Sequence, residues 1–398
     1  MRRTLGELCT LIVDSEHKTA PAARPGEEYG YSIGTPHIRS GRLLFDSAIP
    51  VDRDTYASWT ARATPREHDL ILTREAPVGQ VARIGPSQRV CLRQRTVLLR
   101  PNLDIVDPKY LLYCLMAPTA QEVMHSKASG STVPHLNIKE VRNLHLEVPP
   151  LTSQKATAEA LGALDDKISA NEQLSTTHEL LLQCKFVQLG LSEEPEPSAG
   201  IPVTDLIRFN PMTGRPTSEN PIYVDMAALS TSRASVTSWT RRAPKSGTRF
   251  RNGDTLLARI TPCLENGKTG YVDFMEPGEI GLGSTEFIVM RTVADVPCEL
   301  AYFLARDARF REHAMRNMIG SSGRQRVSAA DASNYIVNAP DPHRLSAFGE
   351  EAAQAFTHLR SLEIENRTLA ELRDTLLPQL VTGNIRVKDA ERIVEDAT

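Results

Sequence analysis

The sequence lacks the features of secreted and membrane-spanning proteins. No apolar run approaches the roughly 18 residues that indicate a transmembrane helix. The N-terminal stretch MRRTLGELCTLIVDS is too short, and becomes acidic too soon, for a signal peptide. The six cysteines include no CxxC pair, so neither a zinc site nor a disulfide framework is indicated. We therefore expect a cytoplasmic protein with free thiols.

Catalytic motifs are also missing. The chain contains no HExxH, no phosphate-loop GxxxxGK and no GxSxG. GLGSTE (281–286) lacks the third glycine of a dinucleotide loop and precedes its strand instead of following it. NPMT (210–213) does not match the Asn/Asp-Pro-Pro-aromatic tetrapeptide of amino-methyltransferases, and His135 and His145 lack a cysteine or carboxylate cluster. We predict no catalytic residue and no metal site.

Two long helical segments are the main positive feature. They cover residues 149–189 and 345–381, and each follows a proline-marked run that cannot continue as helix. In the second segment apolar residues recur every seven positions, which is typical of a coiled-coil seam. About 36 residues at roughly 1.5 Å each give rods of about 55 Å.

The two segments match each other at a constant offset. An asparagine occurs at equivalent points in both, which favours a polar register device over a merely tolerated polar residue at a frayed position. Coiled-coil or subunit contacts are predicted for eight residues at matching positions of the two segments: Leu164, Asn171, Leu174 and Leu181 in the first, and Leu359, Asn366, Leu369 and Leu376 in the second.

The match extends outside the helices. SWTARA (58–63) resembles SWTRRA (238–243), HDLILTREAP (68–77) resembles GDTLLARITP (253–262), and GST (130–132) resembles GSS (320–322). The chain is therefore interpreted as two diverged copies of one unit, each a globular segment followed by a long helix.

The globular segments combine short strand-like runs, such as LILT and FIVMR, with helical pieces. The predicted class is α+β: two mixed α/β domains separated by two long helices that form an antiparallel coiled coil, with a pseudo-twofold internal repeat. The predicted divisions are an N-terminal domain (1–150), a central helix (151–190), a linker (191–200), a C-terminal domain (201–340), a second helix (341–385) and a tail (386–398).

Charge is distributed unevenly along the chain. Residues 1–150 and 201–340 each carry a net charge of +3, whereas 151–200 and 341–398 carry −5 and −4. Residues 201–340 contain fifteen arginines but two lysines, and arginine is the side chain suited to bidentate contact with phosphates and guanine edges. The pattern favours two globular segments that face an anion.

These residues resemble the DNA-specificity subunit of type I restriction-modification enzymes. The matches are GDTLLARITP, GKTGYV, GSTEFIVMR and GSSGRQRVS in the second half, together with LDDKI and ENRTLAELRDTLLPQLVTGNI in the helices. In the first half no equivalent of GSTEF is evident around CLRQRTVLLR. The resemblance implies two target-recognition domains that each read one half of a split sequence in double-stranded DNA. It also implies a helix pair that docks DNA-methyltransferase subunits.

Polar loops that carry arginine are the candidate DNA contacts. GSSGRQR (320–326) and its counterpart GSTVPHLN (130–137) combine flexible backbone with side chains that can meet phosphates and base edges. Trp59 and Trp239 are expected to pack and not to stack on DNA. The predicted DNA-binding residues are Arg62, Arg74, Ser131, Thr132, His135, Asn137, Arg241, Arg242, Arg259, Lys268, Arg324, Gln325 and Arg326.

We expect a non-catalytic recognition subunit that acts with methyltransferase subunits and restriction or translocase subunits. No cofactor is expected on this chain, while S-adenosylmethionine, ATP and Mg are expected on the partners. The open alternatives are the specificity subunit of a methylation-only or related defence system, a coiled-coil scaffold that binds only proteins, and an intrinsic methyltransferase.

Overall fold

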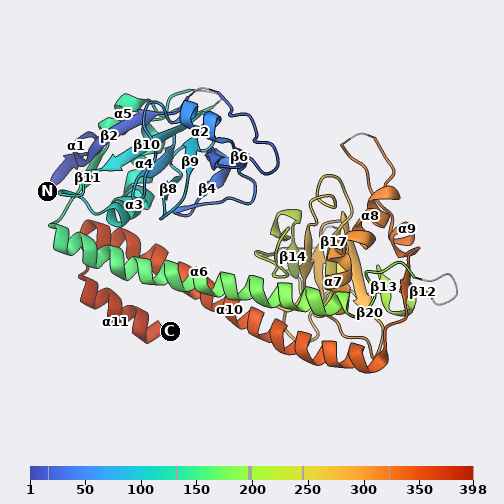
Figure 1. Cartoon of the computed structure of the whole chain (residues 1–398). Coiled ribbons are helices and arrows are strands. Elements are labelled where there is room, and N and C mark those ends of the chain that lie inside the picture. The colour runs from blue at the N-terminus through green and yellow to red at the C-terminus, as the bar shows by residue number, and fades with distance from the viewer. Residues whose placement is uncertain (17, 131–132, 196–199, 244–245, 322, 398) are drawn as a thin grey trace. The chain divides into compact units, whose positions relative to one another are not determined.

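The computed structural model describes residues 1–16, 18–130, 133–195, 200–243, 246–321 and 323–397 (Figure 1). The chain divides into two compact units. Unit 1 comprises Met1–Ile168 and Thr368–Thr398, and unit 2 comprises Ser169–Arg367. Each unit contains a mixed α/β segment and a stretch of two long helices, α6 and α10. The finer division into six segments stays a prediction.

Unit 1 is built on a four-stranded antiparallel sheet. Its strand order is β2 (Cys9–Asp14), β10 (Thr96–Pro101), β7 (Leu70–Thr73) and β8 (Val81–Arg83). Since successive side chains of a strand point to opposite faces, Leu70 and Leu72 pack with the helices of the unit while Ile71 packs on the other face. Both faces are apolar, so the sheet is covered on both sides and its central strands, β7 and β10, are largely buried.

Smaller elements complete unit 1. A second sheet has the order β6 (Ile49–Val51), β3 (Gly30–Ile33) and β9 (Val90–Leu92), and two strand pairs are formed by β1 (Arg2–Thr4) with β11 (His145–Glu147) and by β4 (Ile38–Arg39) with β5 (Arg42–Leu43). The helices are α1 (Leu5–Leu8), α2 (Arg53–Trp59), α3 (Pro108–Met116), α4 (Pro118–Lys127), α5 (Ile138–Arg142) and the 3-10 turn Thr35–His37.

Unit 2 has a corresponding sheet with the strand order β13 (Ile207–Phe209), β20 (Phe287–Thr292), β17 (Thr255–Ala258) and β18 (Thr269–Tyr271). The alternation is the same, because Leu257 packs with the helices of the unit and Leu256 packs toward its second sheet. That second sheet has the order β15 (Thr240–Arg241), β14 (Ile222–Val224), β19 (Gly281–Gly283) and β16 (Thr248–Phe250).

The remaining elements of unit 2 also have counterparts in unit 1. Strand β12 (Gly200–Pro202) pairs with β21 (Ile336–Asn338), as β1 pairs with β11. The helices are α7 (Leu300–Arg306), α8 (Ala308–Arg316) and α9 (Ala329–Ser333), with 3-10 turns at Val203–Asp205 and Met226–Ala228. The strands and helices expected in both globular segments are therefore present.

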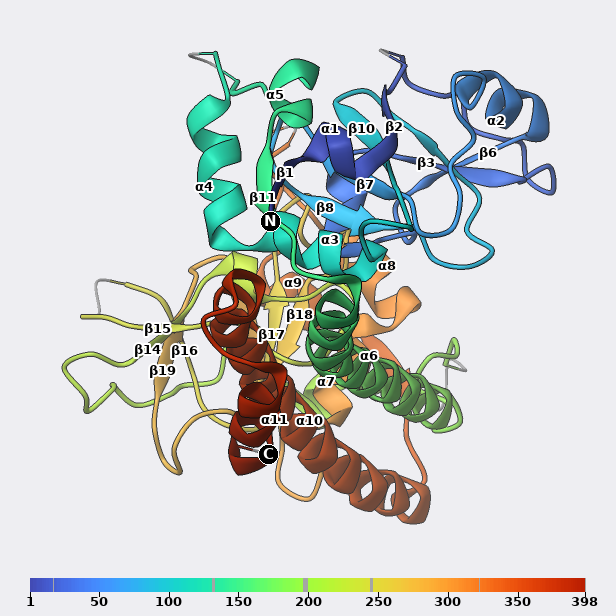
Figure 2. The same ribbon diagram turned by 90° about the vertical axis from the view of Figure 1, so that its left-hand side faces the viewer.

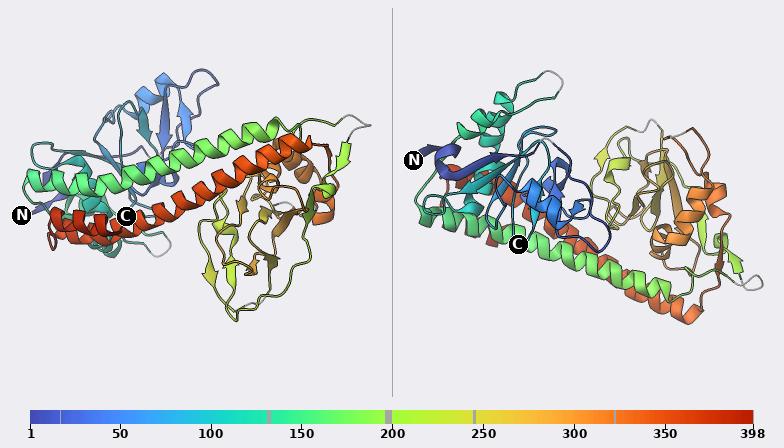
Figure 3. Two further views of the ribbon diagram at one scale, coloured as in Figure 1. Left: turned by 90° about the horizontal axis from the view of Figure 1, so that it is seen from below. Right: turned by 45° about the horizontal axis from the view of Figure 1, so that its top comes forward.

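The two long helices predicted from the sequence are confirmed as α6 (Leu151–Val187) and α10 (Pro342–Thr382). In unit 2 the Asn171 amide donates to Asn366 at 2.9 Å, and Lys185 pairs with Glu351. Because the partner numbers fall along α10 as they rise along α6, the two helix segments of unit 2 are antiparallel and lie side by side (Figure 3). In unit 1, Arg373 of α10 bonds Asp165 of α6 at 2.8 Å.

The C-terminal residues form a further helix that was not predicted. Helix α11 (Val387–Ala397) lies beside the last turns of α10 in unit 1 (Figure 2). Its Ala390 is buried against the cluster that holds Leu376 and Leu380. The segment expected as a tail therefore covers apolar surface of α10.

Four of the predicted contact residues line the buried seam. Leu164, Asn171, Leu369 and Leu376 are at most 4% exposed. Leu359 and Asn366 are half-buried. The hydrogen bond from Asn171 to Asn366 is the arrangement expected of a polar pair at a seam.

Leu174 and Leu181 are 39% and 54% exposed and do not line this seam, so the coiled-coil part of the prediction is wrong for them. Their contact with another subunit stays a prediction. The buried positions of α6 after Asn171 are instead Glu179, Leu182 and Phe186. Leu369 of α10 is buried, whereas Leu174, the residue of α6 that matches it, is exposed. Alignment of the two copies therefore matches buried positions of α10 with exposed positions of α6.

The two tryptophans occupy different structures, so SWTARA and SWTRRA are not equivalent. Trp59 ends α2 and packs near Val51, whereas Trp239 precedes β15 and stacks on Phe274 with ring centroids 4.2 Å apart. Arg367 of α10 covers the Trp239 ring at 4.7 Å. Both rings pack within the protein, as expected. Trp59 lies in unit 1 and Trp239 in unit 2, so the fluorescence of each ring follows the unfolding of one unit.

We expect Leu174→Ala to change the free energy of unfolding by no more than about 0.5 kcal/mol, and Leu182→Ala to lower it by about 2–5 kcal/mol. Both residues lie in unit 2, so guanidinium unfolding followed by Trp239 fluorescence in a Trp59→Phe background measures both. Equal losses for the two variants would contradict the assignment of Leu182 to the seam.

Candidate nucleic-acid interface

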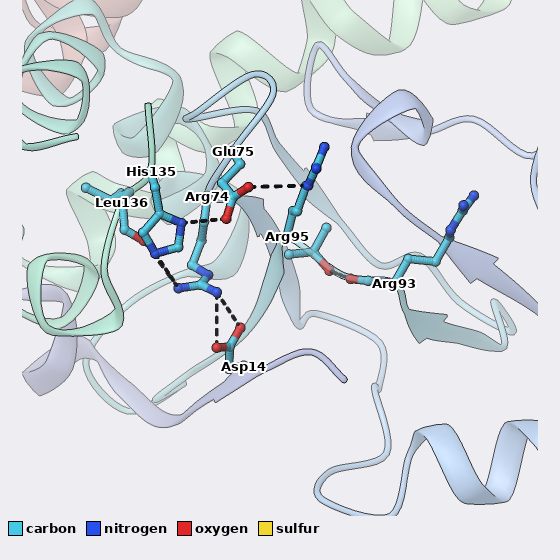
Figure 4. Close-up of polar contacts among 8 residues, drawn as sticks. Asp14, Arg74, Glu75, Arg93, Arg95, His135 and Leu136 are labelled. Carbon is cyan, nitrogen blue, oxygen red and sulfur yellow. Dashed lines mark hydrogen bonds and ion pairs between the residues drawn. The ribbon is translucent and has the colours of Figure 1, made fainter. Parts of the chain in front are cut away.

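Three segments of unit 1 meet at the end of its main sheet. They are the turn after β7 (74–80), the residues before β10 (93–95) and the loop 129–135. The Arg74 N–H donates to the Arg95 carbonyl at 2.8 Å, and the Leu136 N–H donates to the Arg74 carbonyl at 2.9 Å. Ser129 and His135 exchange backbone hydrogen bonds that close the loop. We call these three segments the loop cluster of unit 1 (Figure 4).

Unit 2 repeats this frame with other residues. The Arg259 N–H donates to the Glu286 carbonyl at 3.0 Å, the Val327 N–H donates to the Arg259 carbonyl at 3.0 Å, and Ile319 and Arg326 close the loop. Its loop cluster comprises the turn 259–264, the residues 284–286 and the loop 319–326.

The hydrogen bonds establish which residues correspond in the two units. Arg74 corresponds to Arg259, Arg95 to Glu286, and His135 to Arg326. CLRQRTVLLR is therefore the structural counterpart of the segment that contains GSTEF, although the residues before the strand differ completely. The sequence carried no signal of this equivalence, so Glu75, Arg95 and Glu286 were missed.

A chain of polar contacts runs through the unit 1 cluster (Figure 4). Arg74 is 4% exposed and bonds Asp14 at 3.0 Å. Its other terminal nitrogen lies 3.4 Å from His135 Nε2, while His135 Nδ1 lies 2.6 Å from Glu75 Oε1. The second Glu75 oxygen lies 3.3 Å from Arg95 Nε. The chain thus connects a buried arginine with an exposed one.

Arg95 and Ala76 hold left-handed backbone conformations, with φ of 73° and 45°. Such conformations cost on the order of 1–3 kcal/mol for a non-glycine residue and persist where surrounding contacts enforce them. The Arg95 carbonyl is fixed by the Arg74 N–H. The frame therefore holds Arg95 in a position that its own backbone preference does not favour.

In the loop cluster of unit 2 the charges of the ion pair are exchanged. The carboxylate of Glu286 occupies the position of Arg95, and Arg326 occupies that of His135. Arg326 donates from Nε and Nη2 to Glu286 at 2.8–2.9 Å, and this hydrogen-bonded guanidinium lowers the pKa of Glu286. Nη1 of Arg326 donates to the Arg324 carbonyl at 3.2 Å. Arg324 itself is exposed, and among the described residues its guanidinium has no hydrogen-bond partner. Arg326 thus stabilises the loop that presents Arg324.

The structure brings some predicted residues together and leaves others apart. Arg74 and His135 meet in one cluster, and Arg259, Arg324, Gln325 and Arg326 belong to the other. Gln325 exchanges hydrogen bonds with Thr261 in the turn. Asn137 is exposed at the start of α5. Ser131 and Thr132 lie outside the described residues.

The other predicted residues contact partners outside the loop clusters. Arg62 pairs with Glu16 at 3.1 Å and Arg241 with Glu279 at 2.7 Å. Arg242 lies 3.5 Å over the Tyr223 ring. Lys268 donates to the Met226 carbonyl at 3.1 Å. Their contact with DNA stays a prediction.

No group of three or more His, Cys, Asp or Glu side chains is placed to hold a metal ion in the part of the chain that the structure describes. In that part, none of the helices has the length and apolar character needed to cross a membrane.

Known proteins are similar to this chain in sequence and in fold. Residues 1–179 match the family model of the type I restriction modification DNA specificity domain. The specificity subunit of the type I restriction enzyme EcoAI from Escherichia coli is 28% identical over 264 residues, which are 62% of this chain and 44% of that protein. The EcoEI specificity subunit from the same organism is 24% identical over 289 residues, 69% of this chain and 48% of that protein. The chain thus spans less than half the length of these relatives.

The fold is similar to that of a solved S subunit of a type I restriction-modification system from M. genitalium. The TM-score is 0.55 at 16% identity, over 96% of this chain and 95% of that one. This likeness concerns the fold.

Proposed function

We propose that this chain, whose residues 1–179 match the family model of the type I restriction modification DNA specificity domain, recognises a bipartite target in double-stranded DNA. Each unit would read one half of the target. The observation that carries the proposal is the loop cluster, which occurs twice on the same backbone frame and exposes a different arginine each time, Arg95 in unit 1 and Arg324 in unit 2. A shared backbone frame that carries different side chains suits two domains that bind different DNA sequences.

Arginine suits this role because its planar fork can donate two hydrogen bonds to guanine O6 and N7 or to a phosphate. Arg324 stands at a loop tip whose conformation Arg326 stabilises. The remaining exposed arginines among the predicted residues, Arg62, Arg241 and Arg242, suit phosphate contacts that position the protein on DNA.

We further propose that α6 and α10 form an antiparallel coiled coil and that the two units are related by a pseudo-twofold axis. The paired asparagines and the buried seam residues support the first part. The corresponding strand orders of the two main sheets support the second. The exposed apolar residues Leu174, Leu180 and Leu181 on α6 suit contact with a protein partner.

In this proposal the chain is a non-catalytic subunit. Methyltransferase and restriction or translocase subunits would supply the chemistry, with S-adenosylmethionine, ATP and Mg bound by those partners. The same scaffold would serve a methylation-only system in which no restriction subunit is present.

Exchanging residues 201–340 for the matching segment of a relative with another specificity is expected to change one half of the methylated motif. The other half should stay as it was, because the loop cluster of unit 1 is built from its own residues. Methylation-sensitive sequencing of DNA from cells that carry the complete system measures both halves. If both halves changed, one unit would not correspond to one half-site. If the unmodified system methylated no defined sequence, the scaffold that binds only proteins would be favoured.

A further inference from the structure

We propose that Arg95 is a specificity-determining residue of unit 1, which reads a guanine in the half-site of that unit, and that Glu75 and His135 position it. The inference deepens the proposed function and depends on it.

The geometry leaves the reading end of Arg95 available. Its side chain is 45% exposed, and its Nε lies 3.3 Å from Glu75. Among the described residues, Nη1 and Nη2 have no hydrogen-bond partner, and in Figure 4 the end of the guanidinium points away from Glu75. An arginine that is oriented through Nε while its terminal nitrogens stay available can donate both bonds of a bidentate contact to guanine.

The carboxylate that orients Arg95 is itself held in place. Glu75 is 23% exposed, and its other oxygen lies 2.6 Å from His135 Nδ1. His135 in turn contacts Arg74, which is buried and bonded to Asp14 at 3.0 Å. Glu75 therefore has contacts on both sides, and the direction of the Arg95 guanidinium is set from the interior of the unit.

Unit 2 shows why this role falls to Arg95 in unit 1 alone. The position of Arg95 is taken by Glu286, and that of His135 by Arg326. Arg326 uses Nε, Nη1 and Nη2 for bonds within its own cluster. The exposed guanidinium of unit 2 is instead Arg324 on the loop, so the two frames present their arginines from different segments.

The test uses the full chain assembled with its methyltransferase partners, with the methylated motif read by methylation-sensitive sequencing. Arg95→Ala is expected to make one position of one half-site degenerate, with a roughly ten- to hundred-fold loss of discrimination against the wrong base. Arg95→Lys should relax the same position, because lysine has no planar fork. Glu75→Gln should relax that position less, since the amide keeps the size and shape of the side chain that lies 3.3 Å from Nε and removes only its charge.

Arg324→Ala is the matched control, because it should relax a position in the other half-site only. The Trp59 fluorescence unfolding midpoint in a Trp239→Phe background checks that the Arg95 and Glu75 variants stay folded. A uniform loss of binding with an unchanged motif would make Arg95 a phosphate contact and overturn the proposal, as would full discrimination by Arg95→Lys or no effect of Arg95→Ala. In each of these cases the proposed function still holds if the wild-type system methylates a bipartite motif. If the wild-type system methylates no such motif, the proposed function itself is refuted.

Discussion

Replacing Asp254 with alanine is expected to lower the free energy of unfolding of unit 2 by about 3–5 kcal/mol. Asp254 is fully buried at the start of β17 and binds Arg291 of β20 through two hydrogen bonds, Nε to Oδ1 at 2.6 Å and Nη2 to Oδ2 at 2.7 Å. It also accepts the Arg251 N–H at 2.8 Å. The arginine side chain is only 14% exposed, so removal of the carboxylate leaves a desolvated guanidinium without a counter-charge.

Guanidinium unfolding followed by Trp239 fluorescence in a Trp59→Phe background measures this loss. The matched control is Glu312→Ala, which removes an equally short partner, at 2.5 Å, from Arg316; both side chains of that pair are exposed, at 55% and 75%. An exposed pair contributes about 0–1 kcal/mol, so the control should stay close to the parent. A double variant with Leu at 254 and Met at 291 should recover most of the stability, because no charge is then left unpaired. Equal losses for Asp254→Ala and Glu312→Ala would show that burial does not set the contribution of the pair.

The same pair occurs in unit 1, where Arg100 binds Asp69 at 2.7 and 2.9 Å. The aspartates stand at matching positions of HDLILTREAP and GDTLLARITP. The sequence could reveal this repeat because both copies need an identical buried residue. Packing requirements of this kind also made the long helices and the main strands predictable, since apolar periodicity directly reflects which face is buried.

The loop clusters could not be predicted in this way. Their frame is made by backbone hydrogen bonds, which place no demand on side-chain identity. Arg95 and Glu286 therefore occupy one position with opposite charges, and no sequence match connects them. The match between SWTARA and SWTRRA misled in the opposite way. The residues are identical, but Trp59 ends a helix and Trp239 precedes a strand, so the two rings pack in different surroundings.

The helix seam was predicted for α10 and in part for α6. Sequence alignment of the two copies paired Leu174 with Leu369, but an exposed position and a buried one can both carry leucine. Which face of α6 turns inward depends on the segment that covers it. In unit 2 Glu179 of α6 accepts the Ala234 N–H at 2.9 Å and the Tyr302 hydroxyl at 2.7 Å. These polar contacts, which no hydrophobic pattern records, fix the orientation of the helix.

Asp273→Asn is expected to stabilise unit 2 at pH 7.5 by about 1–3 kcal/mol. Burial beside α10 raises the pKa of Asp273 to about 6, while Arg360 opposes the rise and Glu363 adds to it. A carboxyl whose pKa is higher in the folded state than in the unfolded chain holds its proton more tightly when folded. Its contribution to stability is therefore lost as the pH rises from about 4 through about 6, and above that range the buried charge costs free energy.

The dependence on pH distinguishes this effect from a general gain in packing. The difference in unfolding free energy between Asp273→Asn and the parent, measured by Trp239 fluorescence in the Trp59→Phe background, should shrink as the pH is lowered from 8 to 5. Asp225→Asn is the control, because Asp225 is 60% exposed and lies 3.9 Å from Arg242, so its substitution should change stability little at any pH in this range. A loss of stability in Asp273→Asn at pH 7.5 would contradict the prediction, because it would mean that the attraction to Arg360 outweighs the cost of burying the carboxylate.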